Sequence, residues 1–527
     1  MKNVINYLAL GALIVASISV TSCKKQLNQQ PRYGLNAEAV YGDPANYIQV
    51  LAKLYSGLSM TGLQGPAGKP DIAGMDEGFS AYVRVLFNLQ ELPTDEVICG
   101  WNDPGIPDLN KMSWSAENSF VKGMYFRIYY QIMLCNEFIR ESSDAKMDER
   151  GFSAADKERI TTYRNEARFL RALSYYHALD LFGNVPFVTE EDKVGAFQPP
   201  RITRSELFDY IETELLAIEG ELDSPTSLQY GRASSAAAQF LLAKLYLNAE
   251  VYKGTARYAD CATYCEKVIS SGAFQLDDNY ASLFMADNHT SPEIIFPVVY
   301  DGLYAQTWGG TTFMVNASIG GSMIPADYGV NGKWAGLRAK GNLVDKFADS
   351  TLDARYQFYR NGQTKEITSM SSFTQGYALP KYKNKTEAGI GGSNNGTTAF
   401  VDIDFPMFRL ADAYLMYAEC AARGAANVGT GLFYVNQLRE RAYGNTSFNL
   451  SSIDALTVLD ERARELHWEC TRRTDLIRYN LFTSGDYVWP FKGGIAGGTG
   501  VANHLKLYPL PTSDIVLNPN LIQNPGY

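Results

Sequence analysis

The sequence predicts a mainly α-helical protein, in which tetratricopeptide-like helix hairpins form a superhelical scaffold and a long loop-rich, minor-β region binds the ligand. Long stretches carry apolar residues at i, i+3, i+4 and i+7, which is typical of amphipathic helices packed on one face. These stretches occur in neighbouring pairs. The segments between them lack a helical period. No 34-residue repeat is present, so the hairpin prediction depends on the pairing and not on a consensus.

The first 22 residues are typical of an export signal. Lys2 supplies the positive start, and the apolar stretch from Leu8 to Val20 is too short to span a bilayer. The small residues before Cys23 resemble the lipobox of bacterial lipoproteins, which implies cleavage before Cys23 and lipid modification of its thiol. We therefore expect residues 1–22 to be removed and 23–527 to form a single unit. An ordinary secretory signal with an incidental Cys23 is the alternative.

The helical scaffold is expected mainly over residues 44–59, 116–272 and 406–484. Start signals support two of its helices: Asp43 with Pro44 opens the first, and Thr203 with Glu206 has the pattern of a capping box. The predicted helices span residues 44–59, 116–141, 155–182, 204–221, 233–252, 256–271, 407–423, 427–442 and 452–482.

Three segments form the expected binding region: 60–113, 273–405 and 485–527. They are rich in Gly, Asn, Ser, Thr and Pro, and also in aromatic residues. Loops of this length in a compact protein are usually functional or disordered, and the aromatic content argues against disorder. We therefore expect a face built from loops on top of the helices.

The composition restricts the function. Asp and Glu exceed Lys and Arg by 57 to 47, which gives a net charge of −10 and disfavours a nucleic-acid partner. The four histidines are never spaced i, i+4, and HExxH, GxSxG and GxxxxGK motifs are absent. We therefore expect no enzyme. A loop-borne glycoside hydrolase remains an alternative, because it needs only two carboxylates about 5 to 10 Å apart.

Two pairs of neighbouring acids, Asp76-Glu77 and Asp95-Glu96, are interpreted as exposed loop carboxylates. The charged run from Glu461 to Arg478 predicts a single salt-bridged helix, in which Glu469 and Arg473 are i, i+4 partners. Six cysteines besides Cys23 lack the spacing of a zinc site or of a disulfide scaffold, so we expect structural thiols. They are Cys99, Cys135, Cys261, Cys265, Cys420 and Cys470.

Several stretches in a fixed order together resemble the SusD/RagB family of outer-membrane nutrient-binding lipoproteins. The resemblance covers the chain from Cys23 to the last residue. Its stretches are Arg168–Pro186, Gly231–Ala233, Phe408–Glu419, Val435–Ala442, Glu461–Arg478, Tyr508–Pro511 and Gln523–Tyr527. Four further strings are similar to those of starch-binding members of the family: Met75–Gly78, Glu91–Glu96, Tyr246–Ala249 and Leu283–Asn288.

The resemblance implies a glycan site in the loops. In starch-binding members an arc of three aromatic rings follows the curvature of a starch helix, and its positions correspond to Trp101, Trp308 and Trp334 here. Arg84 keeps its spacing to the first ring, and Asn102 or Asp103 replaces a flanking asparagine. A neighbouring family tryptophan is Cys99 in this chain. The acidic loop after Asn288 is shorter, which argues against a calcium site there. No cofactor is expected; a structural calcium ion is the alternative, but no motif supports it.

Physical reasoning on the rings agrees with this assignment. Pyranose rings present flat C–H faces that lose water readily against an indole, and their hydroxyls need positioned polar partners. Trp101, Trp308 and Trp334 are among the tryptophans that lie outside the predicted helices. The alternative is that they only hold the loops in place.

The resemblance therefore implies a lipid-anchored protein of the outer membrane, facing the cell surface. Such a protein captures starch or maltooligosaccharides and delivers them to a partner TonB-dependent transporter of the SusC type, without nucleic acid and without catalysis. The arc could instead fit a different α-linked polysaccharide. A tetratricopeptide-type adaptor that binds only proteins is a further alternative.

Overall fold

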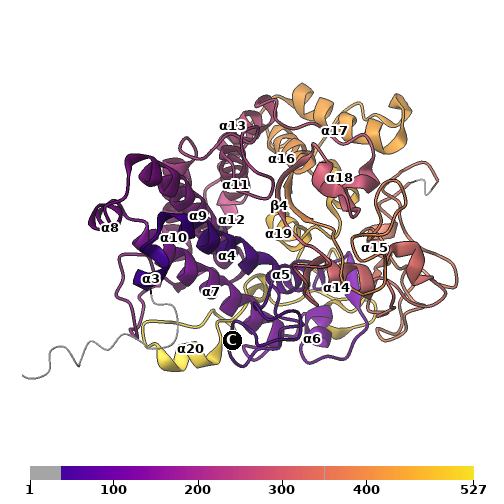
Figure 1. Ribbon diagram of the computed structural model, residues 1–527. Helices are drawn as coiled ribbons and strands as arrows, with labels where there is room; N and C mark the ends of the chain where they lie inside the picture. Colours follow the sequence, from indigo (N-terminus) through magenta and orange to yellow (C-terminus); the bar gives the residue numbers. More distant parts are fainter. Residues whose placement is uncertain (1–36, 349–350) are drawn as a thin grey trace, which may run out of the picture.

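The computed structural model describes residues 37–348 and 351–527, so the predicted signal and Cys23 lie outside the described residues. Helices dominate the fold, and the strands form small two-stranded sheets (Figure 1). This confirms the mainly α prediction with a minor β content.

Helices that follow one another in the chain pack side by side. α7 (Ser119–Glu141) packs on α9 (Ala154–Leu181), and α9 packs on α10 (Arg204–Ile218). The series continues from α11 (Ser235–Leu247) over α13 (Tyr258–Ser270) to α16 (Leu410–Ala422), which packs on α17 (Val428–Tyr443). Figure 1 shows this succession leading from the dark N-terminal helices to the orange ones at the top. A scaffold in which each helix packs mainly on the helices next to it is typical of helical solenoids.

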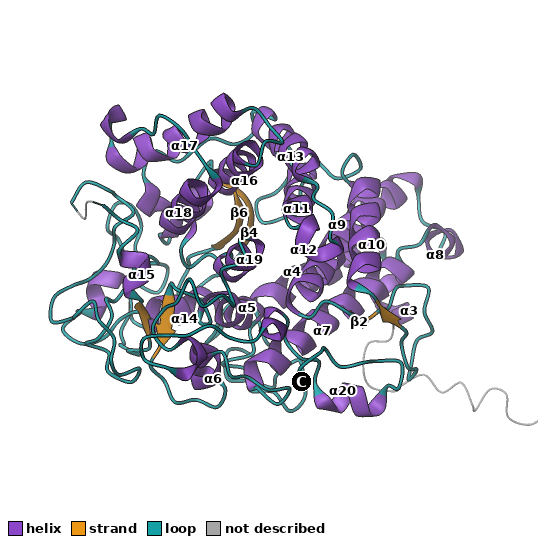
Figure 2. Cartoon of the chain, turned by 180° about the vertical axis from the view of Figure 1, so that it is seen from behind, coloured by secondary structure: helices purple, strands orange, loops and turns teal. Residues whose placement is uncertain are grey.

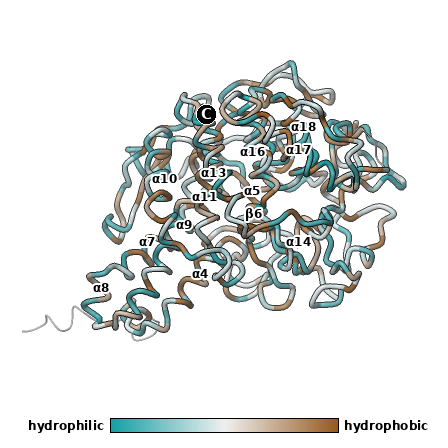
Figure 3. Tube along the Cα trace, turned by 90° about the horizontal axis from the view of Figure 1, so that it is seen from above, coloured by the Kyte–Doolittle hydropathy of each residue, from teal (hydrophilic) through white to brown (hydrophobic). Residues whose placement is uncertain are grey.

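Side-chain caps fix where several of these helices begin. Thr203 and Glu206 form the capping box that the sequence predicts, with Thr203 Oγ1 accepting from the Glu206 amide and the Glu206 carboxylate accepting from the Thr203 amide. Asn118 Oδ1 accepts from two amides at the start of α7. Along helices such as α4 (Tyr47–Ser59) and α7, hydrophobic and hydrophilic residues alternate with the turn of the helix (Figure 3).

The small sheets have their strands in orange in Figure 2, and two of them join segments that are far apart in the chain. β1 (Val97–Cys99) pairs antiparallel with β5 (Leu337–Ala339), so that Cys99 lies opposite Leu337. β4 (Ile294–Val298) pairs antiparallel with β6 (Phe405–Arg409) through two irregularities in register. β2 (Val185–Pro186) pairs with β3 (Arg201–Ile202). The β1–β5 pair brings the segments that carry Trp101 and Trp334 together.

The sequence prediction misses α5 (Tyr82–Glu91), which lies in the predicted loop region. All ten of its residues are buried, including the polar Arg84, Asn88 and Glu91, which share one face at i, i+4 and i+7. α14 (Gly310–Ala317), whose eight residues are all buried, also lies in a predicted loop region. These two helices pack on each other beneath the tryptophans.

The predicted helix over residues 452–482 is wrong in its middle. α18 (Ala455–Leu466) ends before His467, and α19 (Arg472–Arg478) begins after a turn in which Trp468 and Cys470 have positive φ values of 63° and 61°. Glu469 therefore does not pair with Arg473. It accepts from Arg409 and Lys381 instead.

The remaining elements are short, apart from α4 and α17. They are α3 (Ala37–Tyr41), α4 (Tyr47–Ser59), α6 (Ile106–Lys111), α8 (Asp144–Glu149), α12 (Ala249–Lys253), α15 (Gly341–Val344), α17 (Val428–Tyr443), α20 (Thr512–Leu517), and the 3₁₀ turns η1 (Pro44–Asn46), η2 (Tyr280–Phe284), η3 (Asn288–Thr290), η4 (Pro325–Tyr328), η5 (Thr446–Phe448), η6 (Lys492–Gly494) and η7 (Asn503–Lys506).

Candidate functional site

The three tryptophans that the sequence singles out lie in one row. The ring centroids of Trp101 and Trp334 are 6.4 Å apart, and those of Trp334 and Trp308 are 6.0 Å apart. Each pair of ring planes is inclined by 48°, and all three side chains are half-buried. The row is therefore a tilted surface with Trp334 in the middle.

Backbone and core contacts hold Trp101 in place. Its indole Nε1 donates a hydrogen bond of 2.9 Å to the carbonyl oxygen of Trp334, and its ring meets Phe313 of α14 edge-on at 5.7 Å. Gly336 permits this packing, because a Cβ atom there would lie only 2.5 Å from the Trp101 ring. The ring is therefore fixed by residues more than 200 positions away in the chain.

Arg84 lies beneath the row, on α5. It is only 8% exposed, and its guanidinium lies 4.4 Å from the centroid of Phe313 and 5.8 Å from that of Trp101. Nη1 donates to the carbonyl oxygen of Gly78 at 2.8 Å. Burial lowers the pKa of Arg84 to about 10, so it stays charged at neutral pH. A buried cation under an indole supports the ring from below.

Phe400 lies next to Trp308, at one end of the row, and is not among the residues that the sequence predicts. Its ring centroid is 4.5 Å from that of Trp308, and the side chain is only 8% exposed. Phe400 therefore supports Trp308 from behind rather than offering a face of its own. No motif surrounds it, and only its place in an aromatic-rich loop gives a signal.

The polar residues of the prediction lie at the rim. Asn102 and Asp103 are exposed directly after Trp101. On the loop of Trp334, Asn331 and Lys333 are also exposed, and Lys333 Nζ donates to the carbonyl oxygen of Gly321. Amide, carboxylate and ammonium groups therefore surround the half-buried rings, an arrangement that can pair hydroxyl groups at the edge of a stacked ligand.

The interpretation of Asp95 and Glu96 as exposed loop carboxylates is wrong, because both are buried. Arg472 Nε and Nη2 each donate at 2.7 Å to the carboxylate of Asp95. Although burial alone would raise it, the guanidinium lowers the pKa of Asp95 to about 2. Burial, with the nearby Asp95 charge, raises the pKa of Glu96 to about 8. The cluster anchors the segment before β1 to α19 and is closed to ligands.

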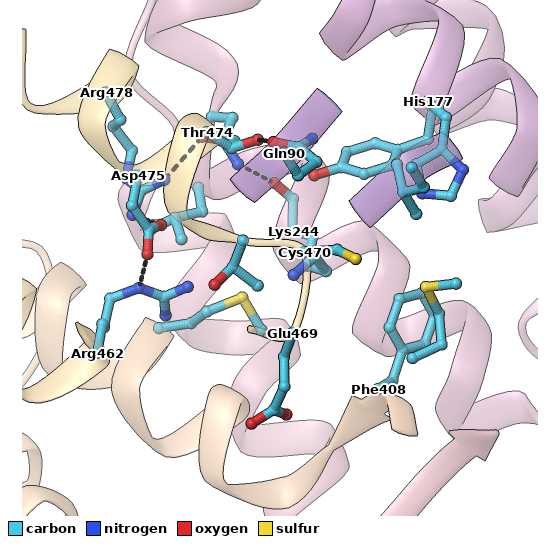
Figure 4. A pocket seen from close by; sticks show the side chains of 17 residues that line it. Gln90, His177, Lys244, Phe408, Arg462, Glu469, Cys470, Thr474, Asp475 and Arg478 are labelled. Atoms are coloured by element: carbon cyan, nitrogen blue, oxygen red, sulfur yellow. Dashed lines mark hydrogen bonds and ion pairs between the residues drawn. The ribbon is translucent and has the colours of Figure 1, made fainter. Parts of the chain in front are cut away.

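A second buried polar cluster surrounds a cavity between α5, α11, α16 and α19 (Figure 4). Asp475 accepts from Arg462 and Arg478, and Thr474 donates to Gln90. The cavity measures about 30 Å³, which is space for about two water molecules and far too little for a sugar ring. Its charged groups form ion pairs, some with one another and some with residues behind the lining, so the cluster serves the packing of the helices.

The six cysteines after Cys23 are free thiols, and all but the half-buried Cys470 are buried. Burial raises the pKa of the Cys99 thiol to about 11, which keeps it protonated. Across the described part of the chain, no group of three or more His, Cys, Asp or Glu residues is placed to hold a metal ion. Within the same residues, no helix has the length and apolar character needed to cross a bilayer.

Comparison with known proteins places this geometry in a family. The model of the SusD family matches residues 302–527, and the model described as "Starch-binding associating with outer membrane" matches residues 108–247. The starch-binding protein SusD of Bacteroides thetaiotaomicron is 34% identical over 99% of both chains. The SusD-like protein P25 of Formosa agariphila is 26% identical over 100% of this chain and 99% of its own.

Solved structures share the fold. The surface glycan-binding protein A from Bacteroides fluxus superposes with a TM-score of 0.71 at 20% identity, covering 92% of this chain and 99% of its own. A SusD superfamily protein from Parabacteroides distasonis gives a TM-score of 0.70 at 22% identity, covering 94% of this chain and 100% of its own. The family resemblance in the sequence is thereby confirmed, and the chain belongs to the SusD family.

Proposed function

We propose that this chain is a cell-surface glycan-binding protein that captures starch and maltooligosaccharides. The observation that carries the proposal is the row of Trp101, Trp334 and Trp308, with successive ring planes inclined by 48°. A tilted row of indoles offers a stacking face to each of several pyranose rings, whereas a single flat platform would offer one. Family membership and a starch-binding relative that is 34% identical support the same ligand class.

The inclination of the rings favours a curved chain. α-1,4-linked glucans coil, so that successive sugar faces turn as the row of indoles turns, whereas β-1,4-linked chains are flat. Because the row is fixed by the Trp101–Trp334 hydrogen bond and by Arg84 below, little ordering cost remains for binding. A different α-linked polysaccharide of similar curvature is the alternative ligand.

The proposal extends to the cell surface. Cys23 after the export signal would carry the lipid that anchors the chain to the outer membrane, and the bound glucan would pass to a TonB-dependent transporter of the SusC type. The family model over residues 108–247, described as associating with the outer membrane, supports this location. The role is capture and delivery without cleavage of the glycan.

Calorimetry with maltoheptaose tests the proposal on Trp101→Ala, Trp308→Ala and Trp334→Ala. We expect each variant to lose at least tenfold in affinity, about 1.4 kcal/mol, with the largest loss at the central Trp334. Phe433→Ala, an exposed ring on α17 away from the row, is the control and should bind like the unchanged protein. Undiminished affinity in all three tryptophan variants would overturn the proposal.

Two further assays separate the alternatives. A panel of soluble glycans, with cellohexaose as the flat β-linked comparison, distinguishes α-1,4-glucan from another α-linked polymer. Incubation of the purified protein with starch, followed by measurement of new reducing ends, tests the glycoside hydrolase. Sustained release that is lost on changing one carboxylate would contradict a binding role alone.

A further inference from the structure

A cavity of about 540 Å³ lies on the other side of the loop that supports Trp308. It opens between the loop 72–79, the start of α7 and the helix α20. Cavities of a few hundred Å³ are the usual size of small-ligand sites. Its lining residues are Ile72, Ala73, Gly74, Met75, Asp76, Phe79, Glu117, Ser119, Lys122, Phe126 and Ser513.

One tight turn connects this cavity to the tryptophan row. Asp76 Oδ1 accepts from the amides of Gly78 and Phe79 at 2.8 and 3.1 Å, which fixes the turn. A Cβ atom at Gly78 would lie 3.7 Å from Cβ of Trp308, so the turn touches the base of that residue. The carbonyl oxygen of Gly78 also accepts from Arg84, below the row. The turn at residues 76–79 therefore contacts the base of Trp308 and also lines the cavity with Asp76 and Phe79.

The floor of the cavity is aromatic and apolar. Phe79 and Phe126 are both half-buried, and Phe79 is held edge-on against Phe120 at 5.2 Å. Met75 packs on α7, because its Cε lies 3.3 Å from where a Cβ at Gly123 would be. Half-buried rings, one on α7 (Phe126) and one packed against α7 (Phe79), are suited to the C–H face of a pyranose.

The walls of the cavity carry groups that pair with hydroxyls. Ser119 and Ser513 contribute hydroxyl groups from α7 and α20. Lys122 and Glu117 form an ion pair of 2.9 Å whose side chains are 32% and 63% exposed, so both keep free hydrogen-bonding capacity. With Asp76 the lining has one net negative charge, which disfavours an anionic ligand and is compatible with a neutral, hydroxyl-rich one.

We propose that this cavity is a second subsite for the same glucan chain, occupied by sugar units beyond those that stack on Trp101, Trp334 and Trp308. The inference rests on the proposed glycan-binding function and extends the binding site beyond the three tryptophans. It predicts that affinity rises with chain length after the tryptophan row is filled, because two linked sites on one ligand reinforce each other.

Ser513→Trp tests the subsite by filling the cavity from α20. Val516→Trp is the matched control, since Val516 lies on the same helix, is 76% exposed and does not line the cavity. Affinity is measured by calorimetry for maltotriose, maltoheptaose and a longer maltooligosaccharide. We expect S513W to bind maltotriose normally and to lose about tenfold for the longest chain, with V516W unchanged throughout.

A second pair of variants keeps the test decisive if S513W does not fold. Phe126→Ala removes a ring from the cavity floor, and Met133→Ala is its control on the same helix, at a position that is 60% exposed. We expect the same loss restricted to long chains for F126A only. Equal affinities of the cavity variants and their controls at every length would overturn the subsite while leaving the proposed function intact. Absence of α-glucan binding by the unchanged protein would refute both.

Discussion

The indole Nε1 of Trp101 donates a hydrogen bond of 2.9 Å to the main-chain carbonyl oxygen of Trp334. One ring of the row is therefore tied to the backbone of the next, so the angle between them does not depend on side-chain packing alone. The antiparallel pairing of β1 with β5 brings the two segments together, with Cys99 opposite Leu337. Pre-organisation of this kind reduces the entropy lost when a ligand binds.

Trp101→Phe separates this hydrogen bond from the stacking face. The variant keeps an aromatic ring but loses the donor, and the carbonyl oxygen of Trp334 loses its partner. We expect about fivefold weaker binding of maltoheptaose, corresponding to the roughly 1 kcal/mol of one hydrogen bond, and a larger loss for Trp101→Ala. Calorimetry measures both. Affinity of W101F equal to that of the unchanged protein would show that the hydrogen bond does not set the ring.

Gly336→Ala displaces the same ring without changing any aromatic residue. The new Cβ atom would lie 2.5 Å from Trp101, so either the ring or the backbone must move. We expect an affinity loss of at least tenfold and destabilisation of about 1 to 3 kcal/mol, as for other overpacked sites. Chemical denaturation and calorimetry check the two effects.

Gly332→Ala is the matched control on the same loop. A Cβ atom there would lie 3.8 Å from Nε1 of Trp334, which is an ordinary van der Waals contact. We expect binding within about twofold of the unchanged protein, well below a 1.4 kcal/mol tenfold step. Equal losses of affinity in G332A and G336A would mean that a change in the loop, and not displacement of the Trp101 ring, weakens binding.

Arg84→Lys tests the support beneath the row. Lysine keeps the charge but cannot place a planar group against the rings of Phe313 and Trp101 while donating to Gly78. We expect a stability loss of about 1 to 2 kcal/mol, together with a several-fold loss of maltoheptaose affinity. Arg360→Lys is the control, because Arg360 is an exposed arginine that also lies near a ring, that of Tyr356. Unchanged affinity in R84K would limit Arg84 to a role in folding.

The sequence predicts the long helices well and the short helices inside the loop-rich segments poorly. α7 and α9 lie within a few residues of the predicted 116–141 and 155–182, because each repeats its apolar pattern over several turns. α5 and α14 have only ten and eight residues and lie in segments rich in Gly, Asn, Ser and Pro, so the helical pattern extends over two to three turns at most. The break between α18 and α19 depends on tertiary partners of Glu469, namely Arg409 and Lys381, which local spacing does not reveal.

The candidate site was predictable only through resemblance and aromatic placement. Trp101, Trp308 and Trp334 lie outside the predicted helices, but so do the buried Trp114 and Trp489. The contact between Trp101 and Trp334 depends on strand pairing across more than 200 residues. The support by Phe400 has no local pattern. The burial of Asp95 and Glu96 could not be predicted either, since their partner Arg472 lies more than 370 positions away.

Glu96→Gln should change the pH dependence of stability. Glu96 is buried, and Arg472 Nε lies 3.6 Å from its Oε1 while bonding Asp95 more closely. Burial, with the charge of Asp95, raises the pKa of Glu96 to about 8 in the folded protein. For a carboxyl with a raised folded pKa, the stabilising contribution is complete below its unfolded pKa of about 4.3 and is lost as the pH rises through 8.

The unchanged protein should therefore lose stability relative to E96Q between pH 5 and 8, by up to about 1.4 kcal/mol per pH unit. Glutamine keeps an oxygen that can accept from the Trp468 amide, so the packing is retained. Urea denaturation at several pH values measures the difference in unfolding free energy between the two proteins. Burial lowers the pKa of Lys340 to about 7, which has the opposite effect on stability, but this effect is the same in both proteins and cancels in the difference. Glu158→Gln changes an exposed position, so its stability should vary with pH in the same way as that of the unchanged protein. If the stability of E96Q also followed that of the unchanged protein at every pH, Glu96 would be ionised over the whole pH range. The charge of Arg472 would then stabilise both carboxylates, Asp95 and Glu96.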